Sequence, residues 1–457
     1  MNARAAVLIA LATSACAVDE AAEVDAYRSV LDAGMPAEVV APHTGDKLDA
    51  KLAMQLANAH NETLAIEGEA YLRALIDRRR AAAAFLPVVM LSPSYFLRDA
   101  GGGTTDGIDV PISATEVVNP VSDSAEVDRT EHAIDVRRAL LYEAQDGLML
   151  DVARTLFEVL RSERSAAVLQ SSLAVQQARV DDVRARRDVG FARPLDVSLS
   201  ESSAADARVA LLIAQRNAST GRATLEFLTG VPLPDIALDG ALDVPDEIPT
   251  TEELTARARQ ERQDVAAAAA AVDTAASRVR VSKGRWYPSL ALNLDVFLSR
   301  DSLPTDQDWT SLLQVNLPLF TGGRIHADVR ESLSLLRESK LVYAQALRAV
   351  QRDIEIAVLN LRESRERVDE LRVTLATARD GSDQAEGLYD AGLATNLERL
   401  AAQTDQLRTE LELENAVFDR QVSYLDLLRA TGVLYEWVGF QRPPPRASGE
   451  GEHAEAR

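Results

Sequence analysis

The residue types that build metal sites and nucleophilic centres are few in this chain and lie far apart. None of the five histidines has a second ligand at the spacing that a metal site needs. The single cysteine, Cys16, excludes a disulfide framework and a cysteine-based zinc site. Three glycines at 101–103 are not followed by the Lys and Ser or Thr of a phosphate-binding loop, so we expect a hairpin loop there. The sequence therefore predicts no enzyme, no metal site and no cofactor. The histidines are His43, His60, His132, His326 and His453.

Cys16 is informative through its position. A basic start at Arg4 is followed by an apolar run over 5–12 and by small residues before the cysteine, which is the form of a secretory signal. The segment resembles a bacterial lipoprotein signal, in which the cysteine is acylated and becomes the new N-terminus. Thr13 departs from that pattern, which prefers Leu. We predict a signal peptide over 1–15 and lipidation at Cys16, with ordinary cleavage after Ala15 as the alternative.

The composition excludes one large class of partners. With 71 acidic and 49 basic residues the 457-residue chain has a net charge of -22, whereas nucleic-acid binding needs clustered Lys and Arg. Aromatic residues make up only 5% of the chain, although 47% of it is hydrophobic, which favours helices packed through small side chains. Beyond the N-terminal segment no run of about 18 apolar residues occurs. We therefore expect any membrane crossing to be made by strands.

The chain contains an internal duplication. A shift of 202 places 188–195 on 390–397, and a shift of 201 places Pro87 on Pro288. A period this long exceeds that of solenoid repeats, so it indicates a duplicated half-structure. The predicted organisation is an acidic leader, a first repeat, a Pro-rich linker, a second repeat and a disordered C-terminal tail. These segments span 16–46, 47–230, 231–250, 251–433 and 434–457.

Each repeat is predicted to hold one helix, two strands and two very long helices. The first helices cover 48–86 and 252–287 and end at a proline, which stops a helix. The long helices, over 124–189 and 324–390, would each span about 100 Å. Along 333–378 apolar residues recur at steps of three and four, which is typical of a coiled coil.

The strands show the alternation of a sheet with one apolar and one polar face. Leucines and valines occupy every second position over 290–298 and again over 313–319, and a weaker pair lies near 89–97 and 108–121. This pattern fits a soluble sandwich or a transmembrane barrel. Four strands are too few to close a barrel, because the smallest known ones have about eight. In lipid, several chains must contribute, and three give twelve strands.

Four motifs together resemble the TolC-type outer-membrane efflux protein family over about 48–433. They are Tyr287-Pro-Ser before a strand, Leu317-Pro-Leu-Phe-Thr-Gly-Gly-Arg before a long helix, Tyr389-Asp-Ala-Gly at a hairpin tip and Leu428-Arg-Ala-Thr-Gly at the close. The first repeat departs from the second motif with Asn119-Pro-Val-Ser. The resemblance implies a mainly α fold with a small β part: long antiparallel helical hairpins and four transmembrane strands per chain. Three chains would form a twelve-stranded β-barrel in the outer membrane and a twelve-helix tunnel in the periplasm of a Gram-negative bacterium.

The resemblance also implies roles at the hairpin tips. Asp196, Tyr389 and Glu398 match gate positions, whereas Ala394 and Ala401 stand where the family has a basic and a second acidic residue. At the tips a periplasmic adaptor protein would dock, on four residues. These are Gly190, Phe191, Gly392 and Leu393. An ordinary helix turn, and an ordinary solvated charge at Glu398, are the alternatives.

The function that this resemblance implies is that of an exit duct. The chain would be the homotrimeric outer-membrane channel of a tripartite efflux or type I secretion system, in contact with outer-membrane lipid and joined through the adaptor to an inner-membrane transporter. A periplasmic coiled-coil scaffold or adaptor without a pore is the alternative, but it does not explain the two alternating segments over 290–298 and 313–319.

Overall fold

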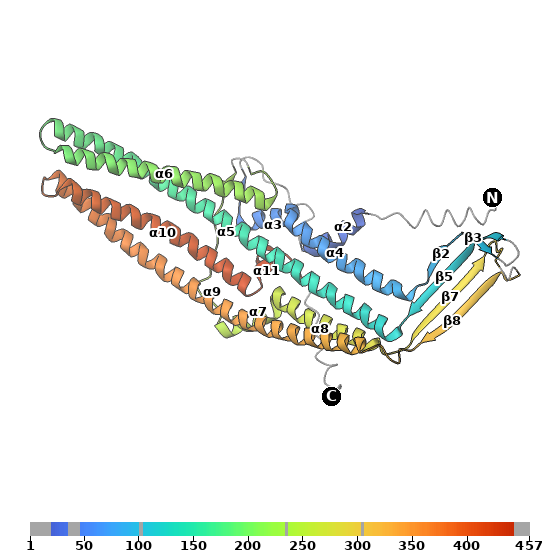
Figure 1. The fold of residues 1–457 in the computed structure, drawn as a ribbon. Coiled ribbons are helices and arrows are strands. Elements are labelled where there is room, and N and C mark those ends of the chain that lie inside the picture. The colour runs from blue at the N-terminus through green and yellow to red at the C-terminus, as the bar shows by residue number, and fades with distance from the viewer. Residues whose placement is uncertain (1–19, 35–45, 100–103, 234–235, 303–305, 443–457) are drawn as a thin grey trace.

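A bundle of long helices and a small β-sheet occupy opposite ends of the elongated chain (Figure 1). The computed structural model describes residues 20–34, 46–99, 104–233, 236–302 and 306–442. The first repeat contains α3 (Ala50–His60), α4 (Glu62–Ala82), η1 (Ala83–Phe85), β2 (Val88–Leu91), β3 (Ser94–Asp99), β4 (Thr104–Asp109), β5 (Pro111–Val118), α5 (Pro120–Asp188) and α6 (Pro194–Thr229). The second contains α7 (Thr251–Glu261), α8 (Gln263–Gly284), β7 (Ser289–Phe297), β8 (Trp309–Asn316), α9 (Arg324–Asp390) and α10 (Asn396–Ala430). Four short elements flank these: α2 (Glu20–Leu31), β1 (Lys47–Leu48), β6 (Ala237–Leu238) and α11 (Leu434–Val438).

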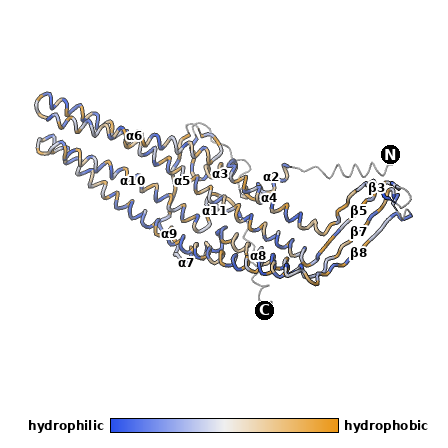
Figure 2. Tube along the Cα trace, viewed as in Figure 1, coloured by the Kyte–Doolittle hydropathy of each residue, from blue (hydrophilic) through white to orange (hydrophobic). Residues whose placement is uncertain are grey.

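The predicted fold class is confirmed: the chain is mainly helical with one small sheet region. Helices α5 and α9 are 69 and 67 residues long, and each packs antiparallel against the helix that follows it. In the described residues, no helix combines the length and hydropathy that crossing a membrane requires. Figure 2 shows polar and apolar residues following one another closely along the helices.

Four antiparallel strands form the main sheet in the order β2-β5-β7-β8. Cross-strand neighbours share a face, so the pairing of Leu290 with Val315 and of Leu292 with Leu313 builds an apolar face. On the other face Asp295 lies opposite Ser113, and Asn293 opposite Thr115. Glu116 is an exception, since its pairing with Leu292 places it on the apolar face.

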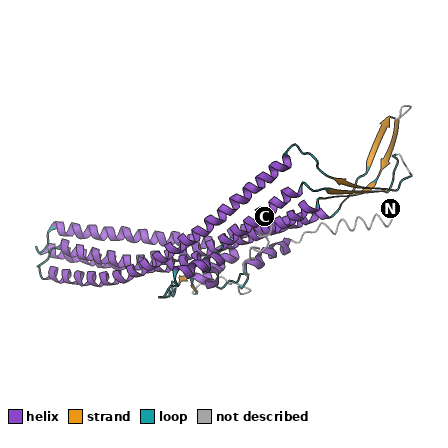
Figure 3. Cartoon of the chain, turned by 90° about the horizontal axis from the view of Figure 1, so that it is seen from below, coloured by secondary structure: helices purple, strands orange, loops and turns teal. Residues whose placement is uncertain are grey.

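The first strand pair is longer than the second and is divided in two. Pro93 and Pro111 lack the N–H that a ladder needs, and the chain leaves the main sheet at these points. Beyond them β3 and β4 pair only with each other, and their hairpin stands at an angle to the other strands (Figure 3). At the helical end of the sheet, β5 stops at Val118 and the Asn119 side chain caps α5 by accepting from the Ser122 N–H at 3.0 Å.

Each first helix, expected to be continuous, is broken at equivalent places. Asn61 ends α3 and begins α4, whereas Arg262 ends α7 and begins α8; both have extended backbones and lie 201 residues apart. A left-handed glycine fills the space at each break: a Cβ on Gly230 would lie 2.7 Å from the His60 carbonyl oxygen, and one on Gly432 would lie 2.8 Å from the Arg262 nitrogen. The close approach of another helix end therefore interrupts each helix.

The acidic leader and the tail that was predicted to be disordered are both partly folded. In the leader, α2 buries Tyr27 and Leu31. In the C-terminal tail, α11 buries Leu434, and Arg442 forms an ion pair with Asp146 at 2.9 Å, with side chains 2% and 6% exposed. The tail prediction was therefore wrong for 434–442, because these residues cover the core between the hairpins. Residues 1–19, including the predicted signal peptide and Cys16, lie outside the described residues.

Candidate functional site

The two long helical hairpins reverse direction at glycines, far from the sheet (Figure 1). Gly190 and Gly392 have φ values of +85° and +74°, a left-handed conformation that favours glycine. Next to them, Phe191 is 85% exposed and Leu393 is 78% exposed. The structure thus places the four residues predicted for adaptor contact on two open tips with apolar side chains in solvent.

Asp196 lies at the start of α6 and is held by its own turn. Its carboxylate accepts hydrogen bonds from the Arg193 backbone N–H at 2.9 Å and from the guanidinium at 3.0 and 3.1 Å. The guanidinium of Arg193 is the main cause that lowers the pKa of Asp196, and the Arg193 backbone N–H adds to it. In the described residues of the single chain, no hydrogen bond joins Asp196 to the Tyr389 hydroxyl.

Glu398 has a related role at the start of α10. Its carboxylate accepts from the Thr395 N–H at 2.7 Å and from the Thr395 hydroxyl at 2.8 Å, while the hydroxyl accepts from the Glu398 N–H. This is a capping box, which satisfies backbone groups that a helix start leaves unpaired. The backbone hydrogen bond is the main cause that lowers the pKa of Glu398. Within one chain, Glu398 therefore serves as a helix cap, which is the ordinary role given above as the alternative to a gate.

Tyr389 is the centre of a cationic cluster that the sequence did not reveal. Its ring centre lies 4.0 Å from the Arg399 guanidinium and 4.9 Å from that of Arg186, close enough for cation–π attraction. Arg399 is 1% exposed and donates to the Asn396 side-chain oxygen at 2.8 Å. Asn396 in turn donates to the Asp196 backbone carbonyl at 3.1 Å. Tyr389 and Asp196 are therefore connected through Arg399 and Asn396.

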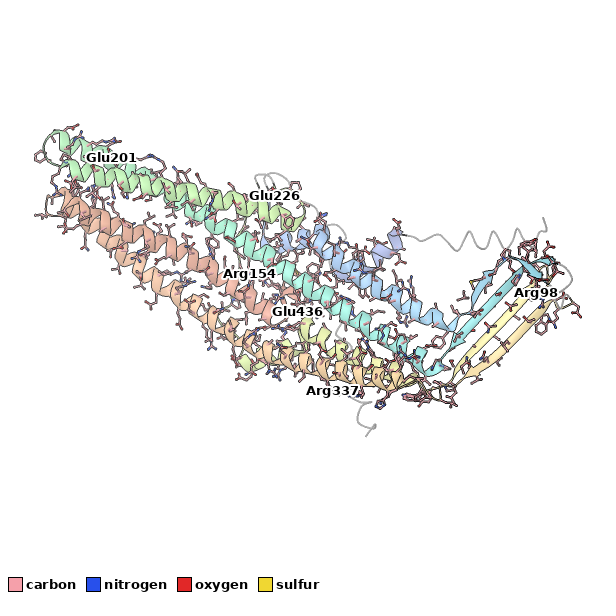
Figure 4. All side chains as sticks on the ribbon, viewed as in Figure 1. Arg98, Arg154, Glu201, Glu226, Arg337 and Glu436 are labelled. Atoms are coloured by element: carbon pink, nitrogen blue, oxygen red, sulfur yellow. The ribbon has the colours of Figure 1, made fainter. Side chains whose placement is uncertain are left out.

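Ion pairs join the first hairpin to the second along much of their length. In five of these pairs α5 supplies the arginine and α9 or α10 the carboxylate, and Arg154 is labelled in Figure 4. The pairs are Arg154–Asp426 at 2.7 Å, Arg161–Asp419, Arg164–Glu414 at 3.1 Å, Arg179–Glu386 at 2.9 Å and Arg186–Asp390 at 2.7 Å. A sixth pair reverses the signs, since Glu143 of α5 pairs with Arg429 of α10. Exposed pairs are individually weak, but a row in which α5 supplies most of the positive charge favours one alignment of the hairpins.

The sequence carries a signal for two of these pairs in the spacing of their charges. Arg154 and Arg161 are seven residues apart, and so are their partners Asp419 and Asp426. Charges at heptad spacing on two neighbouring helices are typical of paired coiled-coil flanks. Arg399 has no such periodic signal, because Tyr389 and Glu386 lie in α9, on the other side of the hairpin turn. Among the described residues, no group of three His, Cys, Asp or Glu side chains lies where it could hold a metal ion.

Comparison with known proteins gives the same architecture. Residues 254–433 match the family described as outer membrane efflux protein. The outer membrane efflux protein BepC of Brucella suis is 27% identical over 329 residues, 68% of this chain and 71% of that protein. The outer membrane protein TolC of Vibrio cholerae is 22% identical over 84% of this chain and 92% of its own.

A solved structure extends the agreement to the fold. The outer membrane protein VceC of Vibrio cholerae superposes with a TM-score of 0.74 at 20% identity, over 84% of this chain and 96% of that one. The duplicated hairpins, the sheet beyond them and these relatives lead to one assignment. The chain is a TolC-type outer-membrane efflux channel that extends into the periplasm, and its second repeat carries the match to the outer membrane efflux protein family.

Proposed function

We propose that three copies of this chain form one passive duct, through which cargo leaves the periplasm. The sheet carries the argument, because β2 and β8 are both edge strands within one chain. A strand edge in lipid leaves unpaired N–H and C=O groups that cost several kcal/mol each. Pairing β8 of one copy with β2 of the next satisfies both edges, and three copies give a closed sheet of twelve strands.

The two faces of the sheet fit such a duct. Leu290, Leu292 and Leu313 on one face suit lipid, whereas Asp295 and Asn293 on the other suit water. The net charge of -22 gives the assembly an acidic field, which favours cations over anions. A pore-free scaffold would need neither the paired faces nor the open edges.

Passage would be controlled at the hairpin tips. Asp196, Tyr389 and Glu398 are the gate residues in this proposal, with Arg399 and Asn396 linking the two hairpins of each chain. Opening would separate the hairpin α5/α6 from α9/α10 and break the ion pairs between them. An adaptor protein, contacting Phe191 and Leu393, would drive this separation, and an inner-membrane transporter would supply the energy.

Planar-bilayer recording of the purified protein tests the duct directly. We expect discrete conductance steps and a reversal potential that shows cation preference in a KCl gradient. A protein that stays monomeric and soluble without detergent, and produces no conductance steps, would refute the proposal in favour of the scaffold.

Lipidation at Cys16 is a separate part of the proposal. Metabolic labelling with an alkyne fatty acid should label the natural protein and leave Cys16→Ala unlabelled. Equal labelling of both proteins would overturn the assignment.

A further inference from the structure

The places where helices meet strands combine positive charge with exposed aromatic rings. Residues 274–294, at the end of α8 and the start of β7, contain four Lys or Arg and no Asp or Glu. At the corresponding end of α4 in the first repeat, Arg78, Arg79 and Arg80 form ion pairs with Glu131, Glu23 and Asp77. In a chain with a net charge of -22, a stretch with four cations and no carboxylate at 274–294 indicates a local requirement for positive charge.

In the second repeat, positive side chains lie where the end of α8 meets the start of α9. Arg285 near the end of α8 pairs with Asp328 in α9 at 2.8 Å, which holds the two helix ends together below the strands. In the described residues, the exposed side chains of Lys283 and Arg324 form no ion pair or hydrogen bond. Two cations are therefore available beside the same edge of the sheet.

Exposed aromatic and aliphatic side chains lie next to these cations. Trp286 is 45% exposed and follows Lys283 by one helical turn, while Phe320 is 89% exposed and precedes Arg324 by four residues. Strand pairing brings both segments together, because Ser289 lies opposite Asn316. The first repeat also has an exposed aromatic residue after a run of cations, since Phe85 follows the arginines at 78–80.

We propose that Lys283, Arg324, Trp286 and Phe320 form a junction collar that binds the headgroups of anionic phospholipid in the periplasmic leaflet of the outer membrane. This inference rests on the proposed membrane position of the sheet. Aromatic rings favour the level of the headgroups, and each Lys or Arg near an anionic surface adds attraction to the phosphate. The apolar sheet face continues from the collar into the hydrocarbon, so a bound lipid would have its acyl chains beside Leu290 and Val315.

The collar also fits the geometry of the whole channel. The helices lie on the periplasmic side, so their junction with the strands coincides with the inner surface of the membrane. A phospholipid held there would fix the depth at which the sheet sits. Free phosphate would not have this effect, because it lacks the acyl chains that meet the apolar face.

Trp286 provides a local probe for the test. The full-length protein carries Trp286 as its only tryptophan when Trp309 and Trp437 are changed to Phe. In nanodiscs, brominated phosphatidylglycerol should quench its fluorescence more than brominated phosphatidylcholine. We expect K283Q/R324Q to lower this preference by roughly fivefold for each cation removed. K340Q/R348Q, which removes the same charge farther along α9, should leave it unchanged.

Native mass spectrometry of the protein with all three tryptophans gives an independent measurement if the probe background folds poorly. It should detect retained phosphatidylglycerol in the natural protein and in K340Q/R348Q, and less in K283Q/R324Q. Equal association of both lipids with the natural protein, or an equal loss in the two double variants, would overturn the collar. Every variant should still conduct in planar bilayers. A missing lipid preference together with normal conductance would therefore contradict the collar and leave the proposed duct in place.

Discussion

The guanidinium carbon of Arg399 lies 4.0 Å from the centre of the Tyr389 ring. This contact joins α10 to α9 next to the tip of the second hairpin. Arg399 also reaches Glu386 at 3.5 Å and Asn396 at 2.8 Å, so one buried cation holds groups from α9 and α10. Asn396 connects the same cluster to the first hairpin.

Arg399→Gln should loosen the tips. The change leaves Glu386 without this cation and removes the charge that faces Tyr389, at a cost of about 2 kcal/mol. We expect higher conductance in planar bilayers and greater entry of large antibiotics into cells. Arg408→Gln is the matched control, because Arg408 is exposed and its ion-pair partners among the described residues, Asp405 and Glu412, both lie in α10. Equal conductance of the two variants would remove Arg399 from the gate.

Tyr389 should act through its ring. In the described single chain no hydrogen bond uses the hydroxyl, whereas two guanidinium groups face the ring. Tyr389→Phe should therefore conduct like the natural protein, and Tyr389→Leu should conduct more. If Tyr389→Phe alone opens the channel, the hydroxyl has a partner in a neighbouring chain, and Asp196 of that chain is the carboxylate to test.

Acid should weaken both helix starts at the tips. The pKa values of Asp196 and Glu398 are lowered from 3.8 and 4.5 by hydrogen bonds to their carboxylates. A lowered pKa means that the stabilisation is complete above the ordinary value and is lost as the pH falls through the lowered one. We expect bilayer conductance to rise below about pH 4. The D196N/E398Q variant should lack this rise in conductance at low pH. If the rise is unchanged in that variant, other titratable groups cause it.

The exposed tips should be needed for export but not for conduction. Phe191→Asp with Leu393→Asp places charges where an adaptor would make apolar contact, so drug resistance should fall in a strain that depends on this channel. Val209→Asp, at a position 56% exposed on α6, is the control. Unchanged resistance in the tip variant, with normal protein levels, would show that the adaptor docks elsewhere.

The glycines at the helix breaks should be sensitive to a single methyl group. Gly432→Ala adds a Cβ at φ +76° that lies 2.8 Å from a backbone nitrogen, so it should destabilise the fold by about 1 to 2 kcal/mol or more. Gly381→Ala, in open space within α9, should stabilise it by about 0.5 to 1 kcal/mol. Thermal unfolding in detergent measures both, and equal shifts would contradict the packing at the break.

Much of the architecture could be predicted from the sequence because it depends on periodicity. Apolar steps of three and four indicated the long helices, alternation indicated β7 and β8, and the 201- and 202-residue shifts indicated the duplication. The helix breaks escaped prediction, because Asn61 and Arg262 interrupt their helices only where Gly230 and Gly432 press against them. The folded parts of the leader and the tail also escaped prediction, since α2 lies in a segment without clear periodicity and α11 has only five residues.

The sequence by itself determined the types of element, their order and the positions of the two turns, since these follow from local spacing and from glycine. Only the tertiary structure decided which partner each tip residue has. It assigned Asp196 to Arg193, Glu398 to Thr395 and Tyr389 to two arginines. The physical reason is that ion pairs and ring contacts act over a few ångströms between residues far apart in the chain, so their partners are fixed only when the hairpins lie side by side.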